Sequence, residues 1–511
     1  MFTVQVPGPE QPYIMTLVAG LHEREAAPLI RHQGQDVTVA AFLRTIYRHA
    51  RVLAGQGIGR GSLVALFAPN HPEALAIRYA AHLLGAAAVF LSVPGTPERR
   101  AELLAQIAPD LLVLFPETAG FLPEGARVRT AAIGIDLPDA LRLDRLAAGE
   151  PGEPIECLAH PDELAVIVSS GGTTGVPKGS CRSFATYSAM VHARSNPKRR
   201  QLVNGHLAYL SQALVDITLL GGGTVVLVDH FEPAATLAMI EVERITDLFL
   251  VEPQLFELMD HPDVGHRDLS SLRVINHIGA SAPASLRRRA RARLGPVIAH
   301  TYGASEIGLV SVLTPAEHDP SVPERFTCAG RIFPGVEVRF RGADGAPVEP
   351  GEPGEIEVRS PAMAAGYRNR PDLQAAAFQD GWYRTGDLGR LDPDGYLHVL
   401  GRTADIAWEG GMMVTPTLLE DTLCGLAQVR YAMVVAEPDG GARLAAMLPW
   451  PGGRIDLEAC RAAVLAQFGA ALARSMVWLP LERMPLTEQG KPDRAAIREL
   501  GREALPAASL S

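Results

Sequence analysis

Apolar runs of strand length alternate with segments of helical spacing along the first 160 residues of the chain. Residues 37–54 carry apolar side chains at helical spacing, 61–67 are typical of a buried strand, 73–84 are helical again, and 86–91 are strand-like. Such runs are typical of buried strands that are separated by crossover helices. The pattern therefore predicts an α/β fold, with mixed sheets that helices cover on both faces.

The later part of the chain predicts two changes of architecture. Short β-rich segments begin at about residue 330, and after Gly401 the pattern becomes a small α+β unit. In this last unit we expect two strands and one helix, at 431–436, 444–448 and 457–472. These changes predict a large N-terminal domain, which includes a β-rich subdomain, and a small C-terminal domain. The predicted domains are residues 1–401 and 402–511.

The composition of the 511 residues argues against several classes of protein. Apolar residues make up 47% and charged residues 20%, which is typical of a globular chain, and the net charge of −10 argues against a nucleic-acid partner. The five scattered cysteines form no C-x-x-C pair, so we expect neither disulfides nor structural zinc and predict a cytoplasmic protein. The longest apolar run, residues 80–93, is too short to span a membrane.

Lysine is rare in this sequence. The 47 basic residues comprise 44 arginines and only three lysines: Lys178, Lys198 and Lys491. A retained lysine indicates a position that needs a compact ammonium rather than a planar guanidinium. Lys178 and Lys491 lie in glycine-containing motifs, whereas Lys198 lies in a segment that predicts a solvated loop. The arginine-rich segment 287–293 predicts a solvated helix face.

The most informative motif is Ser169-Ser-Gly-Gly-Thr-Thr-Gly-Val-Pro-Lys-Gly179, directly after the apolar strand predicted at 164–168. Closely spaced glycines and hydroxyl residues let successive backbone N–H groups face a polyanion, and the Lys178 ammonium adds a cation. The motif lacks the Gly-Lys-Ser/Thr of a Walker A loop, which disfavours a P-loop NTPase. The glycines in 55–61 follow a helix and precede a strand, so they predict a turn and not a dinucleotide-binding loop.

Three later motifs carry groups suited to a nucleotide. Thr301-Tyr-Gly-Ala-Ser-Glu306 follows the strand predicted at 297–300, so a ring, a hydroxyl and a carboxylate emerge at a strand end. Trp382-Tyr-Arg-Thr-Gly-Asp387 supplies a lone carboxylate suited to two vicinal ribose hydroxyls. Pro485-Leu-Thr-Glu-Gln-Gly-Lys-Pro-Asp-Arg494 carries Lys491 on a predicted tight loop.

In this combination and order, the four motifs resemble those of the adenylate-forming superfamily, which includes acyl- and aryl-CoA ligases, nonribosomal adenylation domains and luciferases. The resemblance extends from about residue 35 to about residue 500. It implies an active site between a large N-terminal domain and a small mobile C-terminal domain. It also implies ATP and Mg²⁺, a small-molecule carboxylic acid as substrate, and CoA or a carrier-protein thiol as the acyl acceptor.

The resemblance implies a role for each matching residue. Lys491 would be the catalytic lysine of the first half-reaction, with Lys178 and Ser305 at the phosphates, and Glu306 would hold Mg²⁺. The remaining implied nucleotide-binding residues belong to the phosphates (Ser170, Gly171, Gly172, Thr173, Thr174, Gly175), the adenine side (Gly279, Ala280, Ser281, Tyr302 with Gly303) and the ribose (Asp387, Arg402). In such chemistry a carboxylate attacks the α-phosphorus of ATP and expels pyrophosphate, so cations and aligned N–H groups matter more than a general base.

Two departures from the family pattern concern the acyl acceptor and the acid. Ala404 occupies the hinge position where Asp or Lys is usual, and Met412 and Met413 replace polar residues. This indicates either neutral variation or a CoA step that is weakened or delegated to a partner. Segment 207–220 lacks the His-Asn pair with which the hydroxybenzoate-activating branch reads its acid. A mostly apolar pocket with few polar groups would suit a bulky carboxylic acid, either aromatic or alicyclic. The polar residues that this segment offers are Tyr209, Gln212 and Asp216.

Alternatives to a CoA ligase stay open. A stand-alone adenylating enzyme would hand its acyl group to a carrier protein or a separate transferase. A catalytically silent nucleotide-binding homologue would act as a sensor or scaffold, although the presence of Lys491, Glu306 and Asp387 argues against it. A luciferase-like oxidation is compatible with the motifs, but no feature of the sequence points to it.

Overall fold

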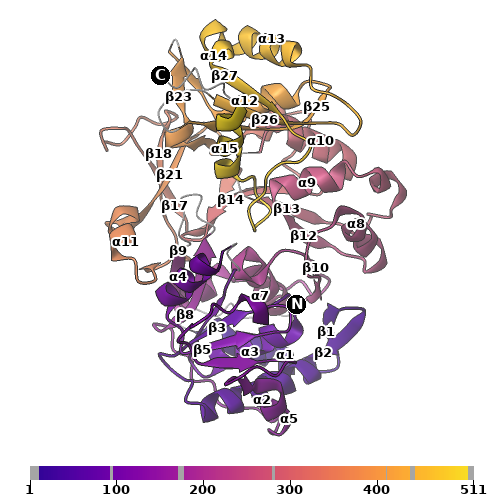
Figure 1. The fold of residues 1–511 in the computed structure, drawn as a ribbon, viewed down its shortest axis with the longest axis vertical. Coiled ribbons are helices and arrows are strands. Elements are labelled where there is room, and N and C mark those ends of the chain that lie inside the picture. Colours follow the sequence, from indigo (N-terminus) through magenta and orange to yellow (C-terminus); the bar gives the residue numbers. More distant parts are fainter. Residues whose placement is uncertain are drawn as a thin grey trace.

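The computed structural model describes residues 11–92, 96–170, 178–278, 282–409, 411–437 and 443–504. Within these ranges the chain is a mixed α/β structure built on two large sheets, which confirms the predicted fold class (Figure 1). None of the helices in the described ranges is long and apolar enough to cross a bilayer.

One large sheet contains eight strands among the described residues. Its strands are parallel to their neighbours except at one edge, where β9 runs antiparallel to both β8 and β19. In spatial order they are β19 (Gly366–Tyr367), β9 (Lys178–Ser183), β8 (Leu164–Ser170), β4 (Ala87–Phe90), β3 (Leu63–Phe67), β5 (Leu111–Leu114), β6 (Thr130–Ala132) and β7 (Leu141–Arg142). The strands predicted at 61–67, 86–91 and 164–168 are thereby confirmed as β3, β4 and β8.

The second large sheet contains nine strands in the described ranges. The strands from β14 to β1 are parallel to their neighbours, and β15, β16 and β2 are antiparallel edges. In spatial order they are β16 (Arg331–Ile332), β15 (Gly308–Leu313), β14 (Ile298–Ala304), β13 (Val274–Ile278), β12 (Asp247–Leu250), β10 (Arg200–Val203), β11 (Thr224–Leu227), β1 (Pro28–His32) and β2 (Gln35–Thr38).

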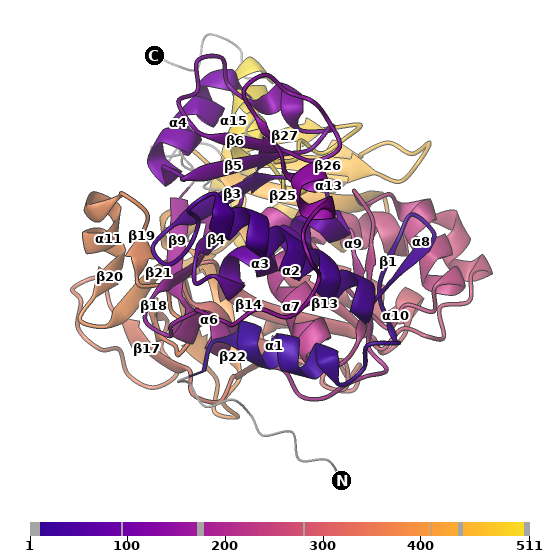
Figure 2. The same cartoon turned by 90° about the horizontal axis from the view of Figure 1, so that it is seen from below.

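Helices pack against these sheets and bury their apolar faces (Figure 2). For example, the Thr38 side chain caps α2 by accepting a hydrogen bond from Ala41 N, and apolar side chains at helical spacing such as Phe42 and Ile46 are buried. The helices are α1 (Tyr13–His22), α2 (Val39–Gly55), α3 (Pro72–Leu83), α4 (Pro97–Ile107), α5 (Leu143–Ala148), α6 (Phe184–Met190), α7 (Gln212–Leu220), α8 (Pro233–Val242), α9 (Glu252–Met259), α10 (Ala284–Leu294) and α11 (Pro371–Ala377).

The predicted β-rich segment forms a separate sheet, and a small α+β unit follows it. The sheet contains β17 (Glu337–Arg341), β18 (Gly354–Arg359), β20 (Phe378–Gln379), β21 (Trp382–Leu391) and β22 (Leu397–Arg402). The unit contains β23 (Ala407–Glu409), β24 (Met412–Val414), α12 (Pro416–Cys424), β25 (Val429–Ala436), β26 (Arg443–Pro449), α13 (Leu457–Phe468), α14 (Ala470–Ser475), β27 (Met476–Pro480) and α15 (Arg494–Ala504). The change of sheet after Arg402 agrees with a boundary at 401/402, which stays a prediction.

Three details differ from the sequence-based expectations. The helix expected at 457–472 is broken at Gly469, whose φ of 89° no helix accommodates. Strand β14 continues to Ala304 because β15 folds back and pairs with it, so Tyr302 lies inside the strand rather than after it. Arg287 in the arginine-rich helix is buried, not solvated, and it donates to the Phe326 and Cys328 carbonyls.

The C-terminal unit docks on helices α9 and α10 of the preceding part. The rings of Phe256 on α9 and Tyr431 on β25 stack with centroids 4.4 Å apart. Arg430 pairs with Glu257 and Asp260 at 3.2 Å each. Apolar residues of both parts belong to one continuous buried cluster, so the seam between the two parts is sealed by core packing (Figure 1).

Candidate active site

Three of the predicted nucleotide-binding residues form one hydrogen-bonded group. Asp387 on β21 and Arg402 on β22 are cross-strand partners, and Arg402 Nε lies 3.1 Å from Asp387 Oδ1. The Tyr302 hydroxyl on β14 donates to Asp387 Oδ2 at 2.7 Å. Burial raises the pKa of Asp387, and the Arg402 charge opposes that shift. The group therefore places the Tyr302 ring next to the Asp387 carboxylate, whose orientation is fixed by its two partners.

A second group surrounds Glu306, which lies in the turn between β14 and β15. The carboxylate is buried and accepts hydrogen bonds from Ser305 Oγ and from the Tyr367 hydroxyl, both at 2.9 Å. The Lys178 ammonium lies 5.5 Å from the centre of the Tyr367 ring. Ser180 Oγ donates to the Ser305 carbonyl at 2.8 Å. Glu306 is thus tied to the start of β9, where the phosphate motif ends.

The flanks of the glycine–hydroxyl motif are placed by strand pairing. Ser170 at the end of β8 and Lys178 at the start of β9 are antiparallel partners, so the motif connects two adjacent strands. Ile278, which precedes the predicted adenine segment, pairs with Thr301 beside Tyr302. The central predicted residues lie outside the described residues: Gly171, Gly172, Thr173, Thr174, Gly175, Gly279, Ala280 and Ser281.

Lys491 lies in the predicted tight loop of the C-terminal unit. Thr487 N donates to the Lys491 carbonyl at 2.7 Å, and Gly490 N donates to the Thr487 carbonyl at 2.8 Å. Burial and the nearby Arg402 charge lower the pKa of the Lys491 ammonium, while the Glu306 carboxylate opposes the shift. The loop therefore brings the Lys491 ammonium into electrostatic range of Arg402, in the first group, and of Glu306, in the second.

The rest of this loop touches the N-terminal part. Burial raises the pKa of the Tyr209 hydroxyl, and the nearby side chains of Ser92 and Gln489 oppose this shift. A Cβ atom at Gly490 would lie 3.5 Å from Gln254 Nε2 on α9. Arg494 Nη1, just beyond the loop, donates to Asp405 Oδ2 at 2.7 Å and so ties the loop to the start of the C-terminal part. The Lys491 loop therefore lies against α9 of the N-terminal part at Gly490.

Two features of the site were not anticipated from the sequence. Tyr367, which orients Glu306, belongs to no predicted motif; its position in a short Gly366-Tyr367 strand gave no local signal. Asp216, expected in the acid pocket, is fully buried on α7 and its carboxylate is already occupied. Its partners are Arg78, Tyr79 and Tyr187, so it is a structural anchor and not a free pocket residue.

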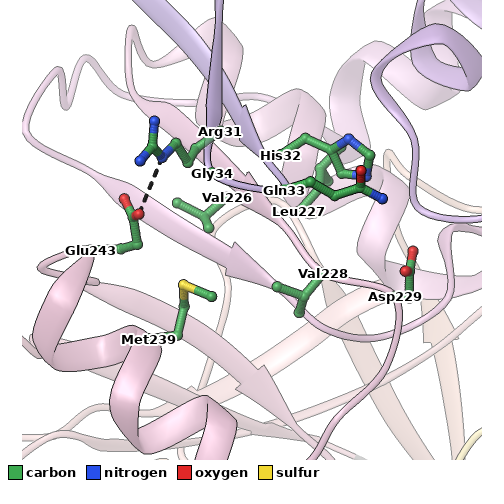
Figure 3. A pocket seen from close by; sticks show the side chains of 10 residues that line it. All are labelled: Arg31, His32, Gln33, Gly34, Val226, Leu227, Val228, Asp229, Met239 and Glu243. Carbon is green, nitrogen blue, oxygen red and sulfur yellow. Dashed lines mark hydrogen bonds and ion pairs between the residues drawn. The ribbon is translucent and has the colours of Figure 1, made fainter.

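A separate cavity of about 170 Å³ lies at the far end of the nine-stranded sheet, between β1, β11 and α8 (Figure 3). Arg31 and Glu243 line it, and Arg31 Nε donates to Glu243 Oε1 at 3.1 Å. None of the predicted site residues lines this cavity. The candidate site is therefore defined by the Tyr302–Asp387–Arg402 group, the Glu306 group and the Lys491 loop, and not by this cavity.

Comparison with known proteins agrees with this arrangement. The chain matches the AMP-binding enzyme family over residues 18–368. A medium/long-chain-fatty-acid–CoA ligase of Mycobacterium tuberculosis is 32% identical over 94% of this chain and 89% of its own length. A feruloyl-CoA synthase of an Amycolatopsis species is 32% identical over 92% of this chain and 95% of its own.

A solved structure extends the likeness to the whole fold. The amide bond synthetase of Marinactinospora thermotolerans matches with a TM-score of 0.84 at 31% identity, over 95% of this chain and 99% of that one. The chain therefore belongs to the AMP-binding enzymes, the adenylate-forming superfamily.

Proposed function

We propose that this protein joins a small carboxylic acid to the α-phosphate of ATP, releases pyrophosphate, and then transfers the acyl group to the thiol of CoA. The observation that carries the proposal is the position of Lys491. Its loop docks on the N-terminal part so that the ammonium lies in range of Glu306 and Arg402. One cation is thus brought to a seam where two anions, a carboxylate and a polyphosphate, must approach each other.

The residues of the site suit this chemistry. In the proposal Tyr302 and Gly303 face the adenine, while Asp387 and Arg402 hold the ribose. Ser305, Lys178 and the motif from Ser170 to Gly175 hold the phosphates, and Gly279, Ala280 and Ser281 flank the adenine. Lys491 lowers the barrier by binding the carboxylate and the α-phosphate oxygens together.

Glu306 is the proposed magnesium ligand. In the described residues no cluster of three or more His, Cys, Asp or Glu side chains is arranged to hold a metal. A single carboxylate fits Mg²⁺ all the same, because this ion keeps several waters and binds substrate phosphates. The Ser305 and Tyr367 hydroxyls fix the Glu306 carboxylate and leave each oxygen a lone pair. When bound, Mg²⁺ supplies charge that shields the pyrophosphate leaving group.

A second candidate differs only in the acceptor. Transfer to an amine would give an amide, and the 31% identical solved structure is an amide bond synthetase. The hairpin after the hinge residue Ala404 is apolar at its surface: Trp408 is 65% exposed and Met412 is 40% exposed. The described side chains of this hairpin include no lysine or arginine that could bind the CoA phosphates.

One experiment tests the proposal and separates the acceptors. Pyrophosphate release is measured over a panel of aliphatic and aromatic carboxylic acids with ATP and Mg²⁺, and the products are identified by mass spectrometry with CoA or with a primary amine added. Acid-dependent pyrophosphate release supports adenylation, and a thioester supports the CoA ligase. An amide without a thioester supports the second candidate. ATP binding with no pyrophosphate release for any acid overturns the proposal.

A further inference from the structure

Gln212 is a buried glutamine whose side chain has no hydrogen-bond partner. It is the first residue of α7 and only 1% exposed, and both Nε2 and Oε1 are buried without a partner among the described residues. A buried amide that makes no hydrogen bond costs free energy, so such groups are rare in folded proteins. Gln201, by contrast, is buried with both ends paired: it donates to Leu202 O and accepts from Arg199.

The helix geometry shows which way the Gln212 amide points. Side chains on a helix tilt toward its N-terminus, so the amide is directed toward the preceding π-helical turn (η2, Leu207–Ser211). Tyr209 in that turn leaves helical angles, with φ −119° and ψ −144°, and the side chain of Gln489, two residues before Lys491, lies near its hydroxyl. The amide is therefore directed toward the side on which the Lys491 loop docks.

The other side of Gln212 is closed. Asp216 lies one turn further along the same face of α7, and its carboxylate is occupied by Arg78 and two tyrosine hydroxyls. The π-helical turn packs against β4 and β8, near the point where β8 leads into the phosphate motif. Ligands of parallel sheets bind outside such carboxyl ends. The amide thus lies between a filled network and the region where the acid must meet the α-phosphate.

We infer that Gln212 determines acid specificity, by hydrogen bonding to a polar group on the body of the acid. This inference rests on the proposed adenylation. A carboxamide offers one acceptor and two donors, so the matching acid is an aromatic or alicyclic one with a neutral N–H, O–H or C=O group away from its carboxylate. An apolar acid leaves the amide unpaired, and a site built in this way discriminates against it.

The test uses pairs of acids that differ in one polar group. We choose indole-3-acetate with benzofuran-3-acetate, and 4-hydroxycinnamate with 4-methylcinnamate. The kcat/KM for pyrophosphate release is measured for the wild type, Gln212→Met and the control Gln201→Met, together with the melting temperature of each free protein. Methionine has nearly the shape of glutamine and removes only the hydrogen-bonding groups.

We expect the wild type to prefer the polar member of at least one pair, and Gln212→Met to reduce that preference by about tenfold or more. Because the free amide is unpaired, Gln212→Met should not lower the melting temperature, whereas Gln201→Met should lower it and leave the preference intact. A lower melting temperature for Gln212→Met, or an equal loss for both members of every pair, overturns the inference alone. Absence of pyrophosphate release with every acid overturns the proposed function as well.

Discussion

At the scale of single residues, Lys491 is the group on which the proposed chemistry depends most. The chain holds only three lysines, and this one is set on a tight loop, buried within electrostatic range of Glu306 and Arg402. Lys491→Ala should lower acid-dependent pyrophosphate release by at least about 10²-fold, the loss expected for one preorganised charge. The exposed Lys198 provides the control, since Lys198→Ala should leave the rate unchanged. Release by Lys491→Ala near the wild-type rate would contradict the role assigned to this ammonium.

Gly303 shows how a residue identity follows from backbone packing. A Cβ atom at this position would lie 2.4 Å from the Gly308 carbonyl oxygen across the β14–β15 hairpin. Gly303→Ala must therefore displace the strand that carries Tyr302, and it should cost about 1–3 kcal/mol of unfolding free energy. Gly20→Ala is the matched control, because no atom lies within 4 Å of its Cβ position in α1. Urea unfolding measures both; equal stability of the two variants would refute the packing argument.

The sequence predicted site residues best where a motif is local. Tyr302, Asp387 and Arg402 were predicted as nucleotide-binding residues, and the strands do bring them together. Tyr367 could not be predicted, because its contact with Glu306 spans 61 positions and depends on how two sheets meet. Asp216 was misassigned for a similar reason: its partner Arg78 lies 138 positions away.

At the scale of elements, a buried ion pair fastens α7 to α3 and α6. Arg78 donates to both carboxylate oxygens of Asp216, and neither side chain is exposed. Asp216→Asn removes the charge that compensates Arg78, so it should lower the free energy of unfolding by about 3–5 kcal/mol. Asp372→Asn, which breaks an exposed pair with Arg370, should change stability little. Chemical denaturation compares the two, and a small effect of Asp216→Asn would contradict the anchoring role.

Most elements could be predicted from periodicity, and the errors have identifiable causes. Strands β3 (Leu63–Phe67) and β4 (Ala87–Phe90) are apolar throughout and buried, so their pattern is unambiguous. The expected helix at 457–472 has suitable residues on both sides of its break, and only the positive φ of Gly469 divides it. Residue patterns do not record such a backbone choice, because glycine is compatible with either conformation.

At the scale of the whole molecule, two buried carboxyls lie on opposite sides of the seam, Glu252 in the N-terminal part and Glu420 in the C-terminal unit. Glu252 on α9 accepts a hydrogen bond from the Tyr431 hydroxyl at 2.6 Å, and Glu420 on α12 accepts one from Val434 N at 2.9 Å. Burial raises the pKa of Glu252 to about 7 and that of Glu420 to about 8. Arg494 lies near both carboxyls and opposes these shifts.

These shifts predict that docking of the C-terminal unit weakens in mild alkali. Both pKa values lie above the ordinary value of 4.5. The two carboxyls therefore stabilise the docked state fully below about pH 4.5, where they are protonated whether or not the unit is docked. This stabilisation is lost as the pH rises through about 7 to 8 and the buried carboxyls ionise. Limited proteolysis at the seam should therefore accelerate between pH 6 and pH 9. The double variant Glu252→Gln with Glu420→Gln should show a smaller change. A pH response of equal size in this variant would contradict the assignment.

The motifs indicated two parts with the active site between them, and the docked C-terminal unit agrees with this arrangement. The boundary at 401/402 and the cytoplasmic location stay predictions, because neither the contacts within the chain nor its relatives decide them. The glycine-rich motif was the strongest signal in the sequence, yet residues 171–177 lie outside the described ranges.

Gln489, near Tyr209, and Lys491 belong to one loop, which has a kinetic consequence for the proposed reaction. Any movement that withdraws the Lys491 ammonium also withdraws Gln489 from the side of Tyr209. Under the proposed function, acid entry and bond formation should then alternate in time, and the acid should be admitted before the loop docks.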